Sequence, residues 1–171
     1  GHDAVQNLTM VQVAFLRMKG IRCIVSANEH PVSANSLTLL NNANILYYHY
    51  AIRDFQPATA FQLQNAAQTM QATLNAGGAV LVFCGFGQGR TGTFVAGWAM
   101  QQYMPRQYLP KNRPVNIDAM CNSTFLGAHF GVETAAQVNA IRSAAALPAM
   151  AGSSRRSPGP SGSTTTSSPP S

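Results

Sequence analysis

A glycine-rich loop carries the residues of this sequence whose types and spacing are best suited to chemistry. It lies between a predicted strand and a predicted helix, where residues 84–91 read CGFGQGRT. Glycines at alternate positions let the backbone curl so that successive N–H groups face inward, and the helix N-terminus adds positive potential there. The loop is therefore predicted to bind a phosphate group through Gly85, Phe86, Gly87, Gln88, Gly89 and Arg90.

Cys84 stands at the mouth of this loop and is the candidate nucleophile. The N–H groups and helix dipole that bind a dianion also stabilise a thiolate, whose pKa falls to about 3.5–7.5 in such settings. Arg90 follows six residues later and offers a planar guanidinium that can bind two phosphoryl oxygens at once, which lysine cannot do. These two residue types predict nucleophilic attack on phosphorus.

The elements that must position this loop follow from the hydrophobic pattern. Apolar residues at three- and four-residue steps predict an amphipathic helix that ends at Gly20, with an apolar stripe of Val5, Leu8, Val11, Phe15 and Met18. Residues 22–26 and 45–50 are rich in branched and aromatic side chains and predict two strands, the second ending near Asp54. A polar, turn-rich stretch through residues 41–42 separates them.

The rest of the chain continues this alternation of helices and strands. Pro57 is expected to open a helix and Gly77 to close it, with an inner face of Phe61, Leu63, Ala67, Met70 and Leu74. Residues 79–83 predict a short strand buried on both faces. Further helices are predicted at residues 91–103, which Pro105 ends, at 117–125 and at 133–147. The pattern indicates an α/β fold with a central, mostly parallel sheet flanked by helices.

Length and composition allow one catalytic or binding domain and a tail. Of the 171 residues, residues 1–150 form the expected domain. Residues 151–171 are rich in Ser, Pro and Thr and cannot bury enough apolar surface to fold, so we expect a disordered tail. The net charge of +6 favours anionic partners. No apolar stretch reaches about 18 residues, so neither a membrane span nor a secretory leader is expected.

The cysteines and histidines indicate neither structural disulfides nor a metal site. Cys23, Cys84 and Cys121 lie far apart and form no CxxC motif, and the histidines show no ligand spacing. Cys23 and Cys121 are expected to be small core residues. We therefore expect no metal, no cofactor and a reducing, cytoplasmic environment.

The loop and its context resemble the Cys-x5-Arg-Ser/Thr loop of the cysteine-dependent protein tyrosine phosphatases, in particular the compact, atypical dual-specificity members. Residues 20–29 look like the helix end and strand before that family's variable loop, and residues 52–57 look like its general-acid loop. Residues 132–137 are similar to its late helix start. The resemblance covers about residues 5–145 and implies the fold of that family.

This resemblance implies a role for five side chains in the hydrolysis of a phosphomonoester. Cys84 would form a cysteinyl-phosphate while Arg90 holds the phosphoryl oxygens, and Asp54 would protonate the departing oxygen and later activate water. Gln137 would orient that water, and Thr91 would stabilise the thiolate as it leaves. From residue chemistry alone, a turn or helix-capping aspartate is an equal alternative for Asp54, and an exposed helix glutamine is the lesser alternative for Gln137.

Three features differ from the family pattern. Phe83 stands where many members have a histidine that orients the loop and tunes the thiolate. No counterpart of the family's opening strand precedes the first helix, so either the sheet is smaller or this sequence lacks that part of the fold. The loop also lacks the lysines of many phosphoinositide-directed relatives, which disfavours a phosphoinositide substrate.

Other interpretations of the loop lead to other functions. A dinucleotide-binding pattern, Gly87-x-Gly89-x-x-Gly92, is present, but no acidic residue stands about twenty positions later and too little chain follows. A non-catalytic module that grips phosphoproteins and a phosphatase of phosphoinositides or RNA ends are the alternatives to a protein tyrosine or dual-specificity phosphatase. Nucleic acid is an unexpected partner, because no basic cluster interleaves with aromatic residues. Export as an effector into a host cytosol stays open.

Overall fold

The sheet at the centre of the molecule has three parallel strands. The structure is a computed structural model and describes residues 4–103 and 117–147. Within them, β1 (Ile21–Ser26) pairs with β2 (Leu46–His49) on one side and with β3 (Ala79–Phe83) on the other. This confirms the parallel sheet, its small size and the position of the strand at residues 79–83, but this strand is half-buried and not buried on both faces as predicted. The predictions for Pro105 and for the tail at residues 151–171 lie outside the described residues.

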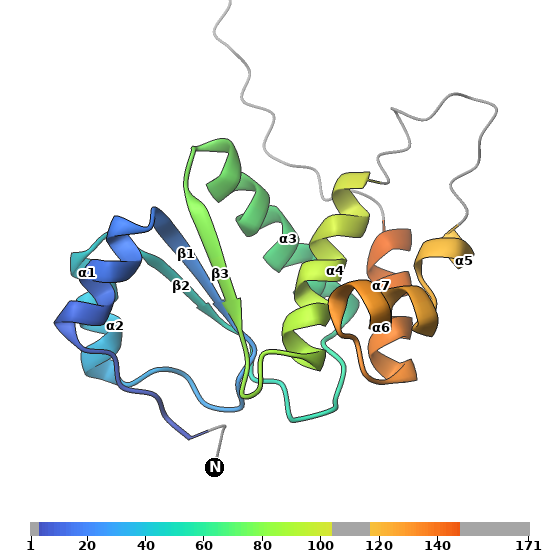
Figure 1. Ribbon diagram of the computed structural model, residues 1–171, viewed down its shortest axis with the longest axis horizontal. Helices are drawn as coiled ribbons and strands as arrows, with labels where there is room; N and C mark the ends of the chain where they lie inside the picture. The colour runs from blue at the N-terminus through green and yellow to red at the C-terminus, as the bar shows by residue number, and fades with distance from the viewer. Residues whose placement is uncertain (1–3, 104–116, 148–171) are drawn as a thin grey trace, which may run out of the picture.

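Helices cover both faces of this sheet. The described helices are α1 (Met10–Met18), α2 (Ala34–Asn42), α3 (Ala60–Asn75), α4 (Gly89–Tyr103), α5 (Ile117–Met120), α6 (Ser123–Phe130) and α7 (Ala135–Ala146). Figure 1 shows α1 and α2 on one face and α3 and α4 on the other, with α6 and α7 packed beside α4. The predicted α/β fold with flanking helices is therefore confirmed.

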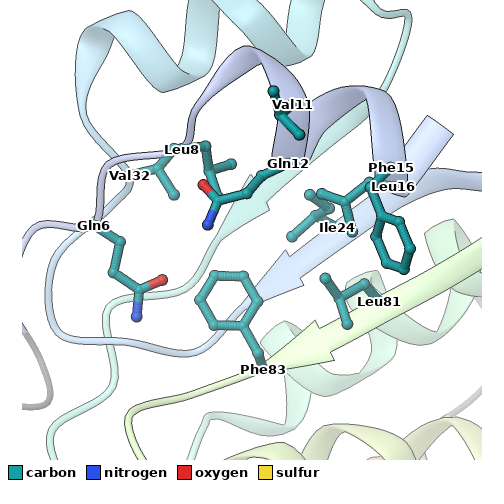
Figure 2. Close-up of a pocket in the computed structure, with 10 residues that line it drawn as sticks. All are labelled: Gln6, Leu8, Val11, Gln12, Phe15, Leu16, Ile24, Val32, Leu81 and Phe83. Atoms are coloured by element: carbon teal, nitrogen blue, oxygen red, sulfur yellow. The ribbon is translucent and has the colours of Figure 1, made fainter.

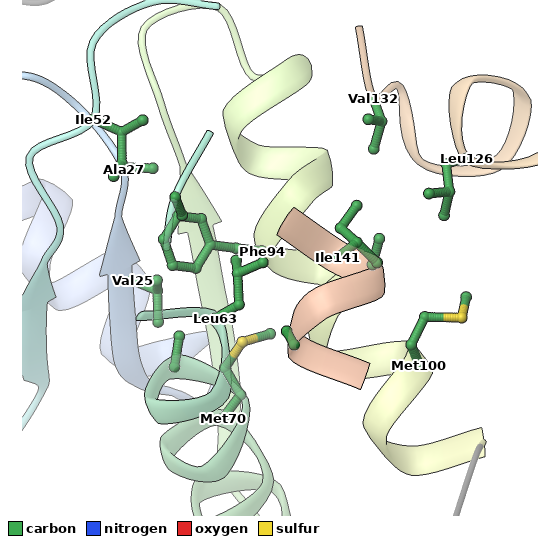
Figure 3. Packing of buried hydrophobic residues seen from close by; sticks show 14 of the residues in the cluster. Val25, Ala27, Ile52, Leu63, Met70, Phe94, Met100, Leu126, Val132 and Ile141 are labelled. Atoms are coloured by element: carbon green, nitrogen blue, oxygen red, sulfur yellow. The ribbon is translucent and has the colours of Figure 1, made fainter. Parts of the chain in front are cut away.

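The central strand contributes alternate side chains to two apolar cores. Val25 belongs to the larger core, which also contains Leu63 of α3, Phe94 of α4 and Ile141 of α7 (Figure 3). Ile24 belongs to the smaller core on the side of α1 and α2. Full burial of a side chain of this size stabilises the fold by about 1.5–3 kcal/mol, so β1 is anchored from both faces.

Helix α1 begins later than the apolar spacing predicts. Thr9 caps it, because its hydroxyl accepts the N–H of Gln12 at 3.2 Å while the Gln12 side chain accepts the N–H of Thr9 at 2.9 Å. This capping box starts the helix at Met10. Val5 and Leu8 therefore lie before the helix, and their assignment to it is wrong.

The predicted stripe of α1 also faces solvent instead of the core. Val13 is the buried residue of this helix, and Leu16 packs beside it against the smaller core. Four stripe residues are more than half exposed: Val5, Val11, Phe15 and Met18. Because the sheet ends at β3, no further strand among the described residues covers this side of α1.

Helix α3 begins at Ala60, three residues after Pro57, because Thr59 forms a capping box with Gln62. Three residues of the predicted inner face are buried as expected, namely Leu63, Ala67 and Met70. Two are exposed and correct the prediction, namely Phe61 and Leu74. Phe61 stands two residues from Leu63, about 200° around the helix, and cannot share its face. Leu74 lies on that face but in the last turn.

The remaining differences concern element boundaries and one missed helix. Residues 34–42 form α2 behind the cap Ser33, where the sequence indicated only turns. The helix predicted at residues 117–125 is two helices, because Asn122 caps α6. The other shifts are small: α4 starts at Gly89 instead of Thr91, α7 spans residues 135–146 instead of 133–147, β1 starts at residue 21 and β2 covers residues 46–49 instead of 45–50. Within the described ranges, no helix is long and apolar enough to cross a membrane.

Candidate active site

The glycine-rich loop joins β3 to α4 and places Cys84 directly after the last residue of β3. Cys84 is 7% exposed, and its Sγ accepts the N–H of Gly87 at 3.2 Å. Burial raises the pKa of this thiol, but hydrogen bonds from the hydroxyl and N–H of Thr91 and from the N–H groups of Gly87 and Phe86 outweigh it. The pKa of Cys84 is therefore lower than that of an ordinary thiol, and the loop favours a thiolate.

Two glycines give the loop its shape for different reasons. Gly87 has φ of +79°, a left-handed conformation that residues with a Cβ rarely adopt. At Gly89 a Cβ would collide with the carboxylate of Glu133. The N–H of Gly89 donates to Oε2 of Glu133 at 3.2 Å, so this side chain lies directly against the loop.

Arg90 is buried in the first turn of α4 and is joined to the segment that carries Asp54. Its Nη1 donates to the carbonyl of Ile52 at 2.9 Å, and its Nη2 lies 3.2 Å from Oδ1 of Asp54. A guanidinium held through two nitrogens keeps its planar donor edge in one orientation. The structure thus brings together the phosphate-binding arginine and the general acid that the resemblance implies.

Asp54 lies in a turn well after β2, and three elements hold this turn. The N–H of Asp54 donates to Oε1 of Glu29 at 3.4 Å, just beyond the end of β1. The carbonyl of Phe55 accepts the hydroxyl of Thr134, the cap of α7, at 3.4 Å, and Arg90 binds from α4. Phe55 has φ of +59°, a conformation that costs a bulky residue of order 1–3 kcal/mol and persists only where surrounding contacts impose it.

Gln137 is fully buried, which excludes the alternative of an exposed helix glutamine. Its Oε1 accepts the N–H groups of Glu133 and Thr134 at 2.9 and 3.2 Å, which completes the capping box of α7. Its Nε2 lies beside Gly89 and has no hydrogen-bond partner among the described residues. A buried donor left unpaired costs about 1–3 kcal/mol, so this amide is suited to bind an oxygen at the loop. The role of Gln137 toward water stays a prediction.

Sequence reasoning missed two carboxylates of this site, Glu29 and Glu133. A signal for Glu133 exists, because it stands four residues before Gln137 at a helix start that resembles the corresponding part of the family. Glu29 has no such signal, since its contact with Asp54 spans 25 residues. Both residues reach the site only because segments that are distant in the sequence pack together.

Other reactive groups lie apart from this arrangement. Asp118 pairs with Arg142 of α7. Cys23 and Cys121 are free, fully buried thiols in the larger core, as predicted, and burial raises their pKa values. Within residues 4–103 and 117–147, no three His, Cys, Asp or Glu side chains gather as metal ligands do. Cys84 is the thiol with the lowered pKa.

Comparison with known proteins gives a family match over more than half of the chain. Residues 3–103 match the family model described as a polymorphic toxin system, DSP-PTPase phosphatase. No curated protein matches the chain.

Solved structures of small phosphatases share the fold. Tk-PTP in its active form is 18% identical, with 83% of this chain and 88% of that chain covered and a TM-score of 0.57. PTPMT1 is 14% identical, with 83% and 86% covered and a TM-score of 0.58. The Yvh1 phosphatase domain from Chaetomium thermophilum is 15% identical, with 78% and 82% covered and a TM-score of 0.55. The chain therefore belongs to the DSP-PTPase phosphatases of polymorphic toxin systems, and its fold is that of the small dual-specificity and protein-tyrosine-phosphatase-like proteins.

Proposed function

We propose that this protein is a tyrosine or dual-specificity phosphatase that removes phosphate from proteins through a cysteinyl-phosphate intermediate. One arrangement carries the proposal: a thiol of lowered pKa, a buried guanidinium and a carboxylate converge on one glycine-rich loop. The thiol belongs to Cys84, the guanidinium to Arg90 and the carboxylate to Asp54. These groups supply a nucleophile, a clamp for phosphoryl oxygens and an acid for the leaving group.

In the first step the Cys84 thiolate attacks phosphorus, and the bond between phosphorus and the leaving oxygen breaks. The electron pair of that bond goes to the leaving oxygen, which takes a proton from Asp54. The loop N–H groups and Arg90 hold the equatorial oxygens and oppose their charge in the transition state. When the substrate binds, the guanidinium of Arg90 contacts the phosphate in place of Asp54. The carboxyl group of Asp54 is then free to contact the leaving oxygen.

In the second step water attacks phosphorus, the bond between sulfur and phosphorus breaks, and its electron pair restores the thiolate. Asp54 takes the proton from the water. We assign the orientation of this water to Glu133 together with Gln137, because both side chains lie against Gly89. The hydroxyl of Thr91, which lowers the pKa of Cys84, stabilises the departing thiolate.

Two exposed aromatic rings next to the reacting groups support an aryl phosphate such as phosphotyrosine as the substrate. Phe55 follows Asp54 and is 56% exposed, and Phe86 lies two residues after Cys84 and is 62% exposed. Aromatic side chains gain free energy by covering another ring. A non-catalytic phosphate-binding module has weaker support, because binding alone requires neither a thiol in the loop nor a carboxyl group beside Arg90.

Phosphate release from a substrate panel tests the proposal. The panel contains a phosphotyrosine peptide, a phosphoserine peptide, a phosphoinositide and a 5′-phosphorylated RNA, each with the wild type and with Cys84→Ser. We expect the fastest release from the phosphotyrosine peptide and none with the variant. Binding without release by the wild type would establish the non-catalytic module. Faster release from the lipid or from the RNA would make the protein a phosphoinositide phosphatase or an RNA-end phosphatase instead.

We further propose that the protein acts as an effector in a reducing cytosol, where its partners are phosphoproteins. The matched family belongs to polymorphic toxin systems. The three cysteines are free thiols, and a nucleophilic thiolate works only while it stays reduced.

Replacing Arg90 with lysine is expected to lower kcat/KM by about 10²- to 10³-fold, the usual loss when one donor to a transition-state oxyanion is removed. Lysine keeps the charge but cannot bind two oxygens in one plane. Steady-state kinetics with an aryl phosphate measure the effect, and the melting temperature serves as the control for folding. Kinetics equal to those of the wild type would make Arg90 a structural residue.

Replacing Glu133 with glutamine is expected to slow the second step and leave the first unchanged. With an activated aryl phosphate, the variant should release a burst of phenol at the wild-type rate and then turn over about 10- to 100-fold more slowly, the size of one charge-assisted hydrogen bond. Rapid-mixing kinetics measure both phases. Asp118→Asn, which removes a carboxylate paired with Arg142, is the matched control and should behave as the wild type. An equal slowing of the burst would exclude a role confined to water.

A further inference from the structure

An open apolar groove lies between α1 and the sheet, and among its lining residues Phe83 adjoins Cys84 in the sequence. Figure 2 shows side chains of α1, β1 and β3 that line the groove. The groove has a volume of about 470 Å³. Its apolar lining includes Leu8, Val11, Phe15, Ile24, Leu81 and Phe83. The side chains of Val11 and Phe15 are 79% and 52% exposed, so the groove is open to solvent along α1. Apolar surface gathered in this way marks a place where another chain binds.

Strand β3, whose side chains line the groove, has an outer edge that no strand among the described residues pairs with. The N–H of Ala79 donates to Gly20 and the carbonyl of Phe83 accepts the N–H of Ala27, so these alternate residues of β3 bond toward β1. Because backbone groups alternate along a strand, the N–H and C=O groups of Val80 and Val82 point to the opposite edge. An unpaired edge of this kind is a template for an added strand.

Two basic side chains stand near the end of the groove where β3 begins. Lys19 lies 5.4 Å from the ring centre of Phe15, which lines the groove. Arg22 donates to the carbonyl of Arg17, and its side chain abuts Gly78, the residue before β3. The lining residues include no Asp or Glu. The groove therefore combines an apolar wall, free backbone groups and a positive end.

We propose that an extended segment of a partner protein binds this groove as a fourth strand on β3. Its alternate apolar side chains would pack between α1 and the sheet, and its acidic side chains would meet Lys19 and Arg22. A second copy of this chain fits less well, because its described carboxylates lie at the active site or pair with Arg142. A membrane surface could cover the exposed part of α1, but it offers no hydrogen bonds to the strand edge.

Selection of peptides against the folded protein tests the proposal. The probe is a displayed library of random nine-residue peptides, and the enriched peptides are then synthesised for affinity measurements. We expect sequences that alternate apolar and polar residues and carry Asp or Glu toward one end. Hydrogen exchange measured with and without such a peptide should show protection of the Val80 and Val82 amides.

Three variants distinguish strand addition from other binding. Val80→Pro removes an N–H that points away from the sheet, and proline is tolerated at such a position on an edge strand. Phe15→Glu places a charge on the apolar wall of the groove. Each is expected to weaken peptide binding by at least about 10-fold, because either the strand hydrogen bond or the apolar contact is lost. Phe61→Glu is the matched control, since Phe61 is 67% exposed and does not line the groove, and should bind as the wild type.

Binding measurements with the same variants can also overturn the proposal. If no peptide is enriched, or if the enriched peptides bind Val80→Pro and Phe15→Glu as tightly as the wild type, strand addition at β3 is wrong. Concentration-dependent dimerisation of the wild type that Val80→Pro abolishes would assign the groove to a second copy. Binding to anionic lipid vesicles that Phe15→Glu abolishes and Val80→Pro leaves unchanged would assign it to a membrane.

Discussion

Replacement of Cys84 by serine is expected to abolish turnover, with a loss of roughly 10⁴-fold or more in kcat for any phosphomonoester substrate. The loop lowers the pKa of the thiol through the Thr91 hydroxyl and through loop N–H groups, so it favours the thiolate form of Cys84. A serine hydroxyl stays protonated under the same conditions. The N–H groups and Arg90 remain in the variant, which should therefore still bind phosphate or tungstate. Phosphate release measured beside calorimetric binding of these oxyanions separates the two functions.

The pH dependence of thiol alkylation gives an independent check on this assignment. A lowered pKa means that the thiolate of Cys84 persists as pH falls below the ordinary thiol pKa of about 8.5, whereas the raised values of Cys23 and Cys121 keep those thiols protonated there. Iodoacetamide at mildly acidic pH should therefore label Cys84 first, and mass spectrometry of the digested protein identifies the site. Turnover by Cys84→Ser at the wild-type rate, or equal labelling of all three thiols, would remove Cys84 from the role of nucleophile.

Replacement of Asp54 by asparagine is expected to slow the reaction by an amount that depends on the leaving group. General acid catalysis matters most when the departing oxygen holds negative charge poorly. With phosphotyrosine or an alkyl phosphate, kcat should fall by about 10²- to 10⁴-fold. With an activated phenol of low pKa the loss should be much smaller. A series of aryl phosphates with different leaving-group pKa values measures this dependence.

A control must separate proton transfer from the structural role of Asp54. The carboxylate also pairs with Arg90 at 3.2 Å, and asparagine can retain a hydrogen bond there without donating an acidic proton. Glu29→Gln is the matched variant, because it alters the support of the Asp54 N–H and leaves the acid itself in place. Its loss should be equal for all leaving groups. The same uniform loss in Asp54→Asn would mean that Asp54 only shapes its turn.

The parts of the site that are local in sequence could be predicted. Strand β3, the loop from Cys84 to Arg90 and the start of α4 form one continuous segment, in which an apolar run, alternate glycines and a helix pattern follow directly on each other. Each of these signals acts over a few residues. The type of every element in this segment was therefore predictable, and only the first residue of α4 differed.

The parts that depend on packing between distant segments could not be predicted. Apolar spacing located α1, but the orientation of its stripe depends on how many strands lie beneath it, and Phe15 consequently faces solvent. The contact between Gly89 and Glu133 depends on where the start of α7 meets the loop. No short sequence pattern determines which distant segments come into contact. Helix α2 was missed because its polar residues resemble a turn, although Ser33 supplies a cap.

The turn that carries Asp54 has a consequence for the order in which activity arises during folding. Its bond to Glu29 spans 25 residues, its bond to Thr134 spans 79, and the bond between Gly89 and Glu133 spans 44. Contacts between such distant residues must overcome the entropy of closing long loops, so they form only as the topology is completed. A chain whose last helix has not yet docked contains the proposed nucleophile but lacks the contacts that support Asp54, the proposed acid, and that place Glu133 at the loop. We therefore expect the proposed phosphatase activity to arise only when folding is complete.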